Sequence, residues 1–198
     1  MNHYGLNLNE YLLIIEPETS VRQQIQSLKQ AFKDRYRFKN AVISKAHITL
    51  MRCLQYESYE QLIVRKLRAM STCVTPFGVE LKGFGNFGHT LYIDVKTHTP
   101  ILNIVTNRRA ELRPFLHNGA KGTPFFTTRP HITIARGLTP TQCQMAWTNW
   151  SRMPFCSFFR ATEMVLLKRQ AGRIGYRRVA RFNFTGRVSL PTQGILFN

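Results

Sequence analysis

A short pattern, histidine–apolar–threonine–apolar, occurs twice in this chain of 198 residues. The first copy is His47-Ile48-Thr49-Leu50 and the second is His131-Ile132-Thr133-Ile134. An arginine follows each histidine by five positions, as Arg52 and Arg136. The composition of the chain predicts only about 0.1 copies of the pattern by chance. The repeat therefore predicts two equivalent strands that serve one site.

The two copies lie in predicted strands at 41–51 and 126–136. Side chains two positions apart in a strand share one face and lie about 6.6 Å apart, so each histidine projects with its threonine while the apolar residues pack on the other side. If the strands face each other, two imidazoles and two hydroxyls form a site. By strict alternation Arg52 and Arg136 face away unless each strand ends or bends first. We expect them at the rim, as substrate contacts or as ordinary surface arginines.

This set of side chains suits phosphodiester chemistry without a metal. One neutral histidine can take a proton from the nucleophile while a protonated one gives a proton to the leaving oxygen. Threonine hydroxyls can bind the non-bridging phosphate oxygens. Hydroxyls are poor zinc ligands and no carboxylate recurs beside either histidine, so we expect neither a metal nor a cofactor. Which histidine is the acid stays open, as does a purely local structural role for the motifs.

Hydrophobic periodicity predicts an α+β protein of strand–helix units forming one domain with two lobes. Further strands are expected at 10–16, 77–84, 89–95, 158–168 and 174–184. Helices are expected from about 17 to 32 and over 58–72, 100–116 and 139–151. No long linker separates the two halves of the chain.

The net charge of +18 is unevenly distributed. Residues 1–111 carry 15 basic and 9 acidic side chains, whereas residues 112–198 carry 13 basic side chains and one acidic, Glu163. This asymmetry predicts a polyanionic partner, nucleic acid first and an anionic membrane surface second, with a solvated basic surface as the alternative. The apolar run at 11–15 is too short to span a membrane, and the N-terminal residues lack a basic signal-peptide region. We expect a cytoplasmic protein with reduced cysteines.

The paired motifs resemble those of the 2H phosphoesterase superfamily, particularly its bacterial 2′-5′ RNA ligase-like (LigT-like) and RNA 2′,3′-cyclic phosphodiesterase branch. Residues 77–87 resemble its Gly/Phe strand and turn, and 164–169 followed by Tyr176 resemble its terminal hairpin. The resemblance implies a bilobal 2H phosphoesterase fold, with two pseudo-symmetric lobes of antiparallel sheet and outer helices around a central cleft. It implies a single domain over 1–198, with a core of about 10–186 and a C-terminal tail at 187–198.

The resemblance also implies roles and a reaction. His47 and His131 would be the catalytic pair, and Thr49 and Thr133 would bind the substrate phosphate. Tyr176 would lie near the substrate, with packing in the hairpin as the alternative. The expected reaction is metal-independent hydrolysis of a terminal 2′,3′-cyclic phosphate of RNA to a 2′-phosphate, with 2′-5′ RNA ligation as its reverse. RNA ends with a cyclic phosphate are the expected partner, without an obligate protein partner.

Three alternatives remain at this point. Relatives act on small cyclic nucleotides such as ADP-ribose 1″,2″-cyclic phosphate, or on 2′-5′ oligoadenylate; the high charge favours a polynucleotide instead. A non-catalytic RNA-binding module would stack bases on aromatic residues such as Phe84, Phe87 and Phe125. The third alternative is a basic membrane-surface protein, but the sequence contains no basic amphipathic helix strong enough to support it. The charge skew predicts that the second lobe and the Lys168–Arg187 hairpin provide most of the RNA track.

Overall fold

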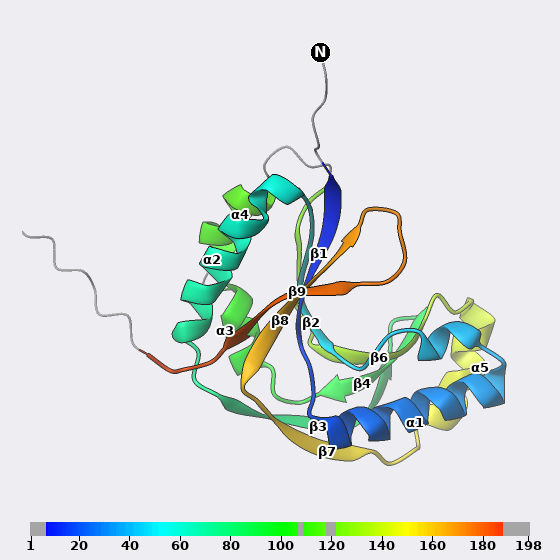
Figure 1. Cartoon of the computed structure of the whole chain (residues 1–198). Coiled ribbons are helices and arrows are strands. Elements are labelled where there is room, and N and C mark those ends of the chain that lie inside the picture. Colours follow the sequence, from blue (N-terminus) through cyan, green and yellow to red (C-terminus); the bar gives the residue numbers. More distant parts are fainter. Residues whose placement is uncertain (1–6, 107–108, 118–121, 188–198) are drawn as a thin grey trace, which may run out of the picture.

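The structure is a computed structural model that describes residues 7–106, 109–117 and 122–187 (Figure 1). Apart from Arg187, the predicted C-terminal tail lies outside these residues. Nine strands form one antiparallel sheet in the order β7-β3-β4-β6-β2-β1-β8-β9, with β5 paired to β2. This arrangement confirms the α+β class.

The strands are β1 (Leu8–Ile15), β2 (Ile48–Tyr56), β3 (Phe77–Asn86), β4 (Thr90–Val95), β5 (Phe125–Phe126), β6 (His131–Arg136), β7 (Cys156–Ala161), β8 (Glu163–Gln170) and β9 (Arg177–Asn183). The α-helices are α1 (Thr19–Tyr36), α2 (Glu60–Thr72), α3 (Thr99–Thr106), α4 (Arg109–His117) and α5 (Pro140–Trp150). Two short 3₁₀ helices, η1 (Lys39–Val42) and η2 (Glu57–Tyr59), precede β2 and α2.

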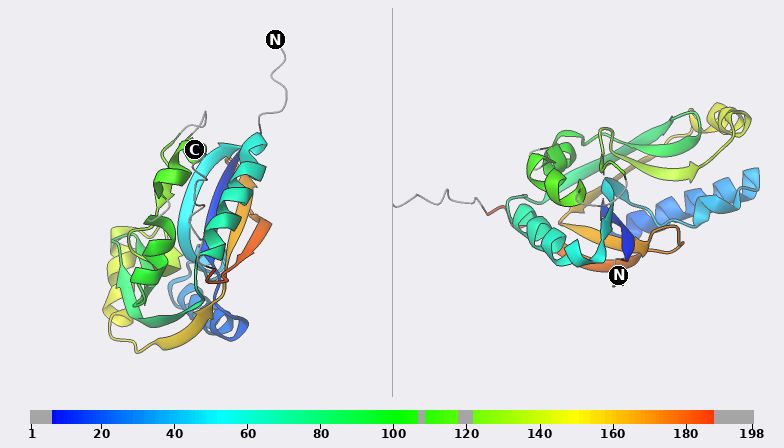
Figure 2. Two further views of the ribbon diagram at one scale, coloured as in Figure 1. Left: turned by 90° about the vertical axis from the view of Figure 1, so that its left-hand side faces the viewer. Right: turned by 90° about the horizontal axis from the view of Figure 1, so that it is seen from above.

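The sheet consists of two halves that meet at one point. Strands β2 and β6 share a single register pair, Ile48 with Ile132, and both residues are fully buried. The β6 half contains β7, β3, β4 and β6, and the β2 half contains β2, β1, β8 and β9. Helices α2, α3 and α4 pack on the β2 half, and α1 and α5 pack on the β6 half. Seen from above, these two groups of helices lie at opposite ends of the molecule (Figure 2).

The chain crosses between the halves several times. Helix α1 follows β1 of the β2 half but packs against β6 and β7, and α3 follows β4 of the β6 half but packs against β2. Strand β7 pairs with β3, whereas β8, which begins only two residues after β7 ends, pairs with β1. Each half is therefore built from segments that are distant in sequence.

Several predicted boundaries differ from those of the structure, and a crossing between the halves explains one of them. The predicted strand 158–168 is two strands, because the chain leaves one half at Thr162 and enters the other. The predicted strand 126–136 is divided into β5 and β6, which pair with β2 before and after a turn. The predicted helix 100–116 corresponds to α3 and α4, and residues 107–108 between them lie outside the described residues.

The strand predicted at 41–51 starts only at Ile48. The residues before it form η1 and a turn, in which the buried ammonium of Lys29 holds Ser44 through its carbonyl and hydroxyl oxygens. This tertiary anchor on α1 replaces the strand pairing that the apolar residues of the segment suggested. His47 consequently lies where the turn ends and β2 begins.

Candidate active site

The single register pair between the halves brings the two motifs together. Ile48 pairs with Ile132 in antiparallel orientation, so His47 and Thr133 lie one residue to one side of this pair. His131 and Thr49 lie one residue to the other side. Because neighbours in a strand alternate, all four side chains project from the face opposite to the two buried isoleucines. We call this the motif face.

A one-residue bulge follows the threonine in both motifs. Thr49 pairs with Ile14 and Met51 pairs with Leu13, so Leu50 is the extra residue in β2.

The bulge in β6 is equivalent. Thr133 pairs with Tyr92 and Ala135 pairs with Leu91, so Ile134 is the extra residue. A bulge shifts the alternation by one position, which returns Arg52 and Arg136 to the motif face. The orientation expected from strict alternation is thereby corrected, because each strand bends before its arginine.

Both imidazoles make the same backbone hydrogen bond. Nδ1 of His47 lies 2.8 Å from the carbonyl oxygen of Lys45, and Nδ1 of His131 lies 2.8 Å from that of Arg129. A carbonyl can only accept, so Nδ1 carries the proton in each neutral ring. The basic lone pair is therefore on Nε2 of both histidines, which is the arrangement required of a general base.

The pKa values of both histidines lie below the ordinary range. Burial is the largest effect that lowers the pKa of His47, and the charges of Lys29 and His131 lower it further. Burial also lowers the pKa of His131, and the charge of Arg129 acts in the same direction. The two histidines are thus close enough for the charge of one to act on the other.

At each histidine, a carboxylate on a neighbouring strand or directly after its end opposes these effects. Asp94 pairs with His131 between β4 and β6, and its charge raises the pKa of that imidazole. Glu16 directly follows the end of β1, next to His47, and raises the pKa of His47. Sequence reasoning missed both carboxylates because Asp94 on β4 and Glu16 just after β1 are remote in sequence from the histidines that they face.

Only one of the two carboxylate oxygens of Asp94 accepts a hydrogen bond from a described residue. Its Oδ2 accepts a hydrogen bond of 2.7 Å from Lys96 Nζ. Its Oδ1 is buried and has no hydrogen-bond partner among the described residues. Glu16 has a looser partner, Arg22, at 3.8 Å.

Aromatic rings form the wall beside His131. Tyr92 stacks on Phe87 with a centroid distance of 4.3 Å, and both rings contact the imidazole, at 5.2 and 5.1 Å. The guanidinium of Arg129 lies over the same two rings, at 5.6 Å from Phe87 and 5.5 Å from Tyr92. Tyr92 can occupy this place because Gly85, its partner on β3, has no side chain; a Cβ there would overlap the ring.

A charged cluster occupies the motif face of the β2 half. Glu10 accepts hydrogen bonds from Arg169, at 2.9 and 2.6 Å, and from the Tyr176 hydroxyl at 2.9 Å. Arg52 lies 3.9 Å from the same carboxylate. The ring of Tyr176 packs against the Arg169 guanidinium, and burial with the nearby Glu10 raises the pKa of Tyr176 to about 12. The structure thus places Tyr176 and Arg52 in one cluster.

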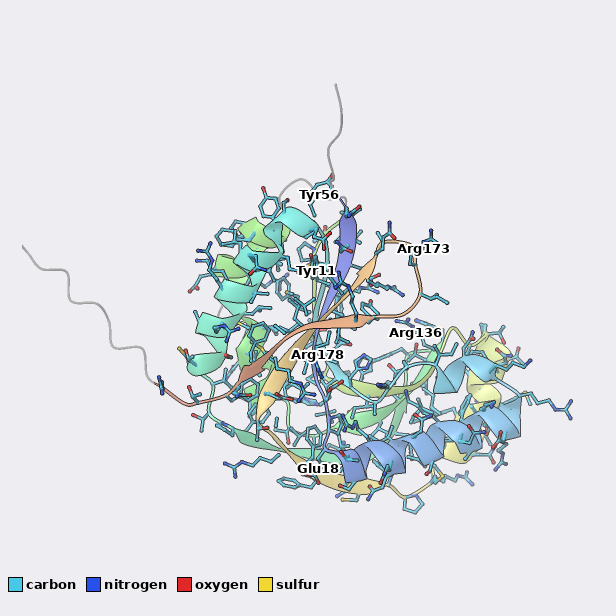
Figure 3. The ribbon with its side chains drawn as sticks, in the orientation of Figure 1. Tyr11, Glu18, Tyr56, Arg136, Arg173 and Arg178 are labelled. Carbon is cyan, nitrogen blue, oxygen red and sulfur yellow. The ribbon has the colours of Figure 1, made fainter. Side chains whose placement is uncertain are left out.

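The basic residues of the predicted RNA track in the Lys168–Arg187 hairpin are not equivalent. Lys168 is buried and forms ion pairs with Glu57 and Glu60, so its expected part in the track is corrected to a structural one. Arg173, at the tip of the hairpin, and Arg178, further along β9, form no ion pair with a described carboxylate (Figure 3).

The described residues contain no group of three or more His, Cys, Asp or Glu side chains placed to hold a metal ion. Within the same part of the chain, no helix is both long and apolar enough to cross a membrane. All four cysteines lie within the described ranges, and none of them is joined in a disulfide.

A two-part antiparallel sheet whose halves meet between two His-x-Thr motifs defines a 2H phosphoesterase. Residues 17–173 match the 2′-5′ RNA ligase superfamily, and the chain belongs to this family. No functionally curated protein matches the chain.

Solved structures share the fold at low sequence identity. TT0787 of Thermus thermophilus is 17% identical, with a TM-score of 0.66, and the match covers 90% of this chain and 100% of that chain. E. coli LigT in its apo form is 16% identical, with a TM-score of 0.63, over 90% of this chain and 98% of that chain. LigT in complex with 3′-AMP is 16% identical with a TM-score of 0.61, over 90% and 99%.

Proposed function

We propose that this protein is a metal-independent RNA 2′,3′-cyclic phosphodiesterase that opens a terminal cyclic phosphate to a 2′-phosphate. The observation that carries the proposal is the meeting of two His-x-Thr motifs across one register pair, with both Nδ1 atoms bound to backbone carbonyls. Membership of the 2′-5′ RNA ligase superfamily supports a phosphodiester substrate.

The reaction needs one base and one acid. Nε2 of one neutral histidine takes a proton from water as the water oxygen attacks phosphorus. The bond between phosphorus and the 3′-oxygen breaks, and the other histidine, protonated, gives its Nε2 proton to that oxygen. The 2′-ester remains, and one water molecule is consumed. If a 5′-hydroxyl attacked the cyclic phosphate in place of water, the same two groups would catalyse formation of a 2′-5′ bond. The reverse reaction would cleave a 2′-5′ bond and release the 5′-hydroxyl.

The remaining motif side chains bind the phosphate. The hydroxyls of Thr49 and Thr133 project with the histidines and can donate hydrogen bonds to the non-bridging oxygens, whose charge increases in the transition state. Arg52 and Arg136 reach the same face through the two bulges, and their guanidinium groups suit a phosphate. None of these four groups requires a metal to bind the substrate.

The charge favours an RNA end over a small nucleotide. The chain carries a net charge of +18, and Arg173 and Arg178 have no described acidic partner. Each additional phosphate that a basic side chain neutralises increases affinity in a salt-dependent way. A mononucleotide offers too few phosphates to use these side chains.

The test is hydrolysis of an RNA oligonucleotide with a 2′,3′-cyclic phosphate end, in buffer with EDTA. We expect a 2′-phosphate product, distinguished from the 3′-isomer by phosphorus NMR and chromatography. The H47A/H131A double variant, checked for folding by circular dichroism, is the control. RNA that remains cyclic in the presence of folded wild-type protein contradicts the proposal, and so does activity that disappears with EDTA and returns with a divalent metal.

A further inference from the structure

A hollow of about 260 Å³ opens next to Arg52 on the β2 half. Its walls include Arg52, Leu54, Thr123 and Phe125, with Glu10 at one side. Pockets for drug-sized ligands are usually about 300–1,000 Å³, so this hollow suits a single flat ring system rather than a whole nucleotide. It contains neither of the two histidines.

Phe125 is an unusual residue to find at this position. It has 43% of its surface exposed although it is large and apolar. Its neighbour Phe126 is buried in the core, so the pair is divided between the two faces of the sheet. Phe125 pairs with Arg52 across β5 and β2, and the Arg52 guanidinium lies 6.0 Å from its ring centroid. An exposed ring beside a guanidinium is a typical binding surface for a nucleobase and its phosphate.

The charge of the cluster favours an anion. Glu10 is the acidic residue at the hollow, and it lies between two guanidinium groups, those of Arg169 and Arg52. Arg169 is close to Glu10, at 2.6 Å, whereas Arg52 is 3.9 Å away and about half exposed. Arg52 is therefore the guanidinium that retains the freedom to bind a ligand phosphate.

The position along β2 indicates which part of the substrate the hollow fits. Thr49 and Arg52 pair with Ile14 and Leu12, which are two residues apart on β1, so the bulge leaves Arg52 about 7 Å from Thr49 along the strand, on the same face. Phe125 is the partner of Arg52 on the edge of β2 that also pairs with β6, and it lies further along β2 than the pair of motifs. A phosphate held between the motifs would thus have Arg52 near the next phosphate of the chain and Phe125 near the base attached to it.

We propose that Arg52 binds the phosphate linking the last two nucleotides and that Phe125 stacks on the base of the penultimate nucleotide. The inference rests on the proposed function, since it assumes that the cyclic phosphate lies between His47 and His131. It adds a substrate class to that function: RNA ends of two or more nucleotides, in preference to a nucleoside cyclic phosphate.

The test compares a nucleoside 2′,3′-cyclic phosphate with a dinucleotide that ends in the same group. We expect wild-type protein to prefer the dinucleotide in kcat/KM, and Phe125→Ala to reduce the ratio of the two values at least about fivefold. Phe125→Leu keeps an apolar side chain for folding and should give a similar reduction. Phe158→Ala is the matched control, because Phe158 is also exposed but lies on the outer strand β7.

A second comparison tests Arg52. A dinucleotide with a neutral methylphosphonate linkage lacks the charge that Arg52 would bind, so Arg52→Ala and this substrate should show effects that do not add. Equal kcat/KM values of wild-type protein for the two natural substrates, a ratio that Phe125→Ala leaves intact, or fully additive effects would each overturn the inference.

Failure of the inference and failure of the proposed function give different results. If neither substrate is hydrolysed, binding of a 3′-phosphorylated dinucleotide with 2-aminopurine at the penultimate position is measured by fluorescence quenching. Binding that Phe125→Ala abolishes would support the hollow while contradicting the phosphodiesterase. Absence of binding, or binding that Phe125→Ala does not affect, would overturn the inference.

Discussion

The ammonium of Lys29 donates hydrogen bonds to the carbonyl oxygen of Ser44 at 2.6 Å and to its hydroxyl at 3.1 Å. Lys29 has only 1% of its surface exposed and forms no ion pair with a described carboxylate. Ser44 lies three residues before His47, so this contact fixes the turn that leads into the first motif. A buried cation without a counter-ion is costly, and burial lowers the pKa of Lys29 to about 8.

The first prediction follows from that pKa. The ordinary value near 10.5 applies to the unfolded chain, so between pH 8 and 10.5 the unfolded state binds the extra proton and stability rises with pH. The free energy of unfolding of wild-type protein should rise across this range by about 3 kcal/mol relative to Lys29→Met. Urea denaturation at several pH values measures it. Lys33→Met, on the same helix, should behave like the wild type, and parallel curves for wild type and Lys29→Met would refute the assignment.

The same substitution, Lys29→Met, should also change the pKa of His47. The charge of Lys29 lowers the pKa of His47, so Lys29→Met should raise it. Imidazole resonances followed by NMR titration report this shift directly, without any activity assay. The pKa of His131, for which Lys29 is not among the causes, should move less. A His47 titration that stays in place would mean that Lys29 has only a structural role.

The two histidines should be individually necessary. His47→Ala and His131→Ala should each reduce kcat by about 10²-fold or more, since each removes one proton transfer. The double variant should be little slower than either single variant, because groups that act as a unit do not give additive losses. Single-turnover rates with cyclic-phosphate RNA measure this. Near-normal turnover of either variant would exclude the two-histidine mechanism.

The rate should peak on the acidic side of neutrality. Burial lowers the pKa of both histidines, so both are mainly neutral at pH 7 and the acid is scarce. As pH falls towards these pKa values, the fraction with one protonated histidine grows, and at still lower pH the base is lost. A profile of kcat/KM should be bell-shaped with its maximum below about pH 6.5, and its two apparent pKa values belong to the pair. A maximum on the alkaline side of neutrality would contradict this.

Substitution of Gly85 should reduce both activity and stability, because the absence of a side chain at this position leaves room for the Tyr92 ring. Gly85→Ala would force the Tyr92 ring away from β3 and against His131, so we expect kcat to fall more than about tenfold and stability to fall by about 1–3 kcal/mol. Combining it with Tyr92→Leu, which removes the overlapping ring atoms, should restore part of the stability. Thermal unfolding and turnover of the three variants measure this; an additive loss in the double variant would refute the steric explanation.

Much of the site could be predicted from the sequence because it depends on local periodicity. The two-residue spacing of His47 and Thr49, and of their counterparts, already determines that they share a face. The bulges could not be predicted, since Leu50 and Ile134 are apolar like their neighbours and only pairing with β1 and β4 reveals them as extra residues.

The other differences also depend on long-range contacts. Nothing local to residues 158–168 shows that the chain changes partners at Thr162. Likewise, the cation and the carboxylates around the histidines come from α1, the end of β1 and β4, and no spacing in the sequence relates them to the motifs. The alternation of side chains within one strand could be predicted from the sequence. The bulges, the changes of pairing partner and the charged neighbours of the histidines depend on contacts between distant segments and could not be predicted.

The crossing of the chain between the halves has a consequence for how activity appears during folding. Strand β8 pairs with β1, near the other end of the sequence, and α1 packs on β6 and β7, which follow it by about 100 residues or more. Neither half can therefore complete its folding until most of the polypeptide is present. Closing such long loops is slow. Turnover regained during refolding, or on the ribosome, should therefore arise in a single late step, and a truncated product should be inert rather than half as active.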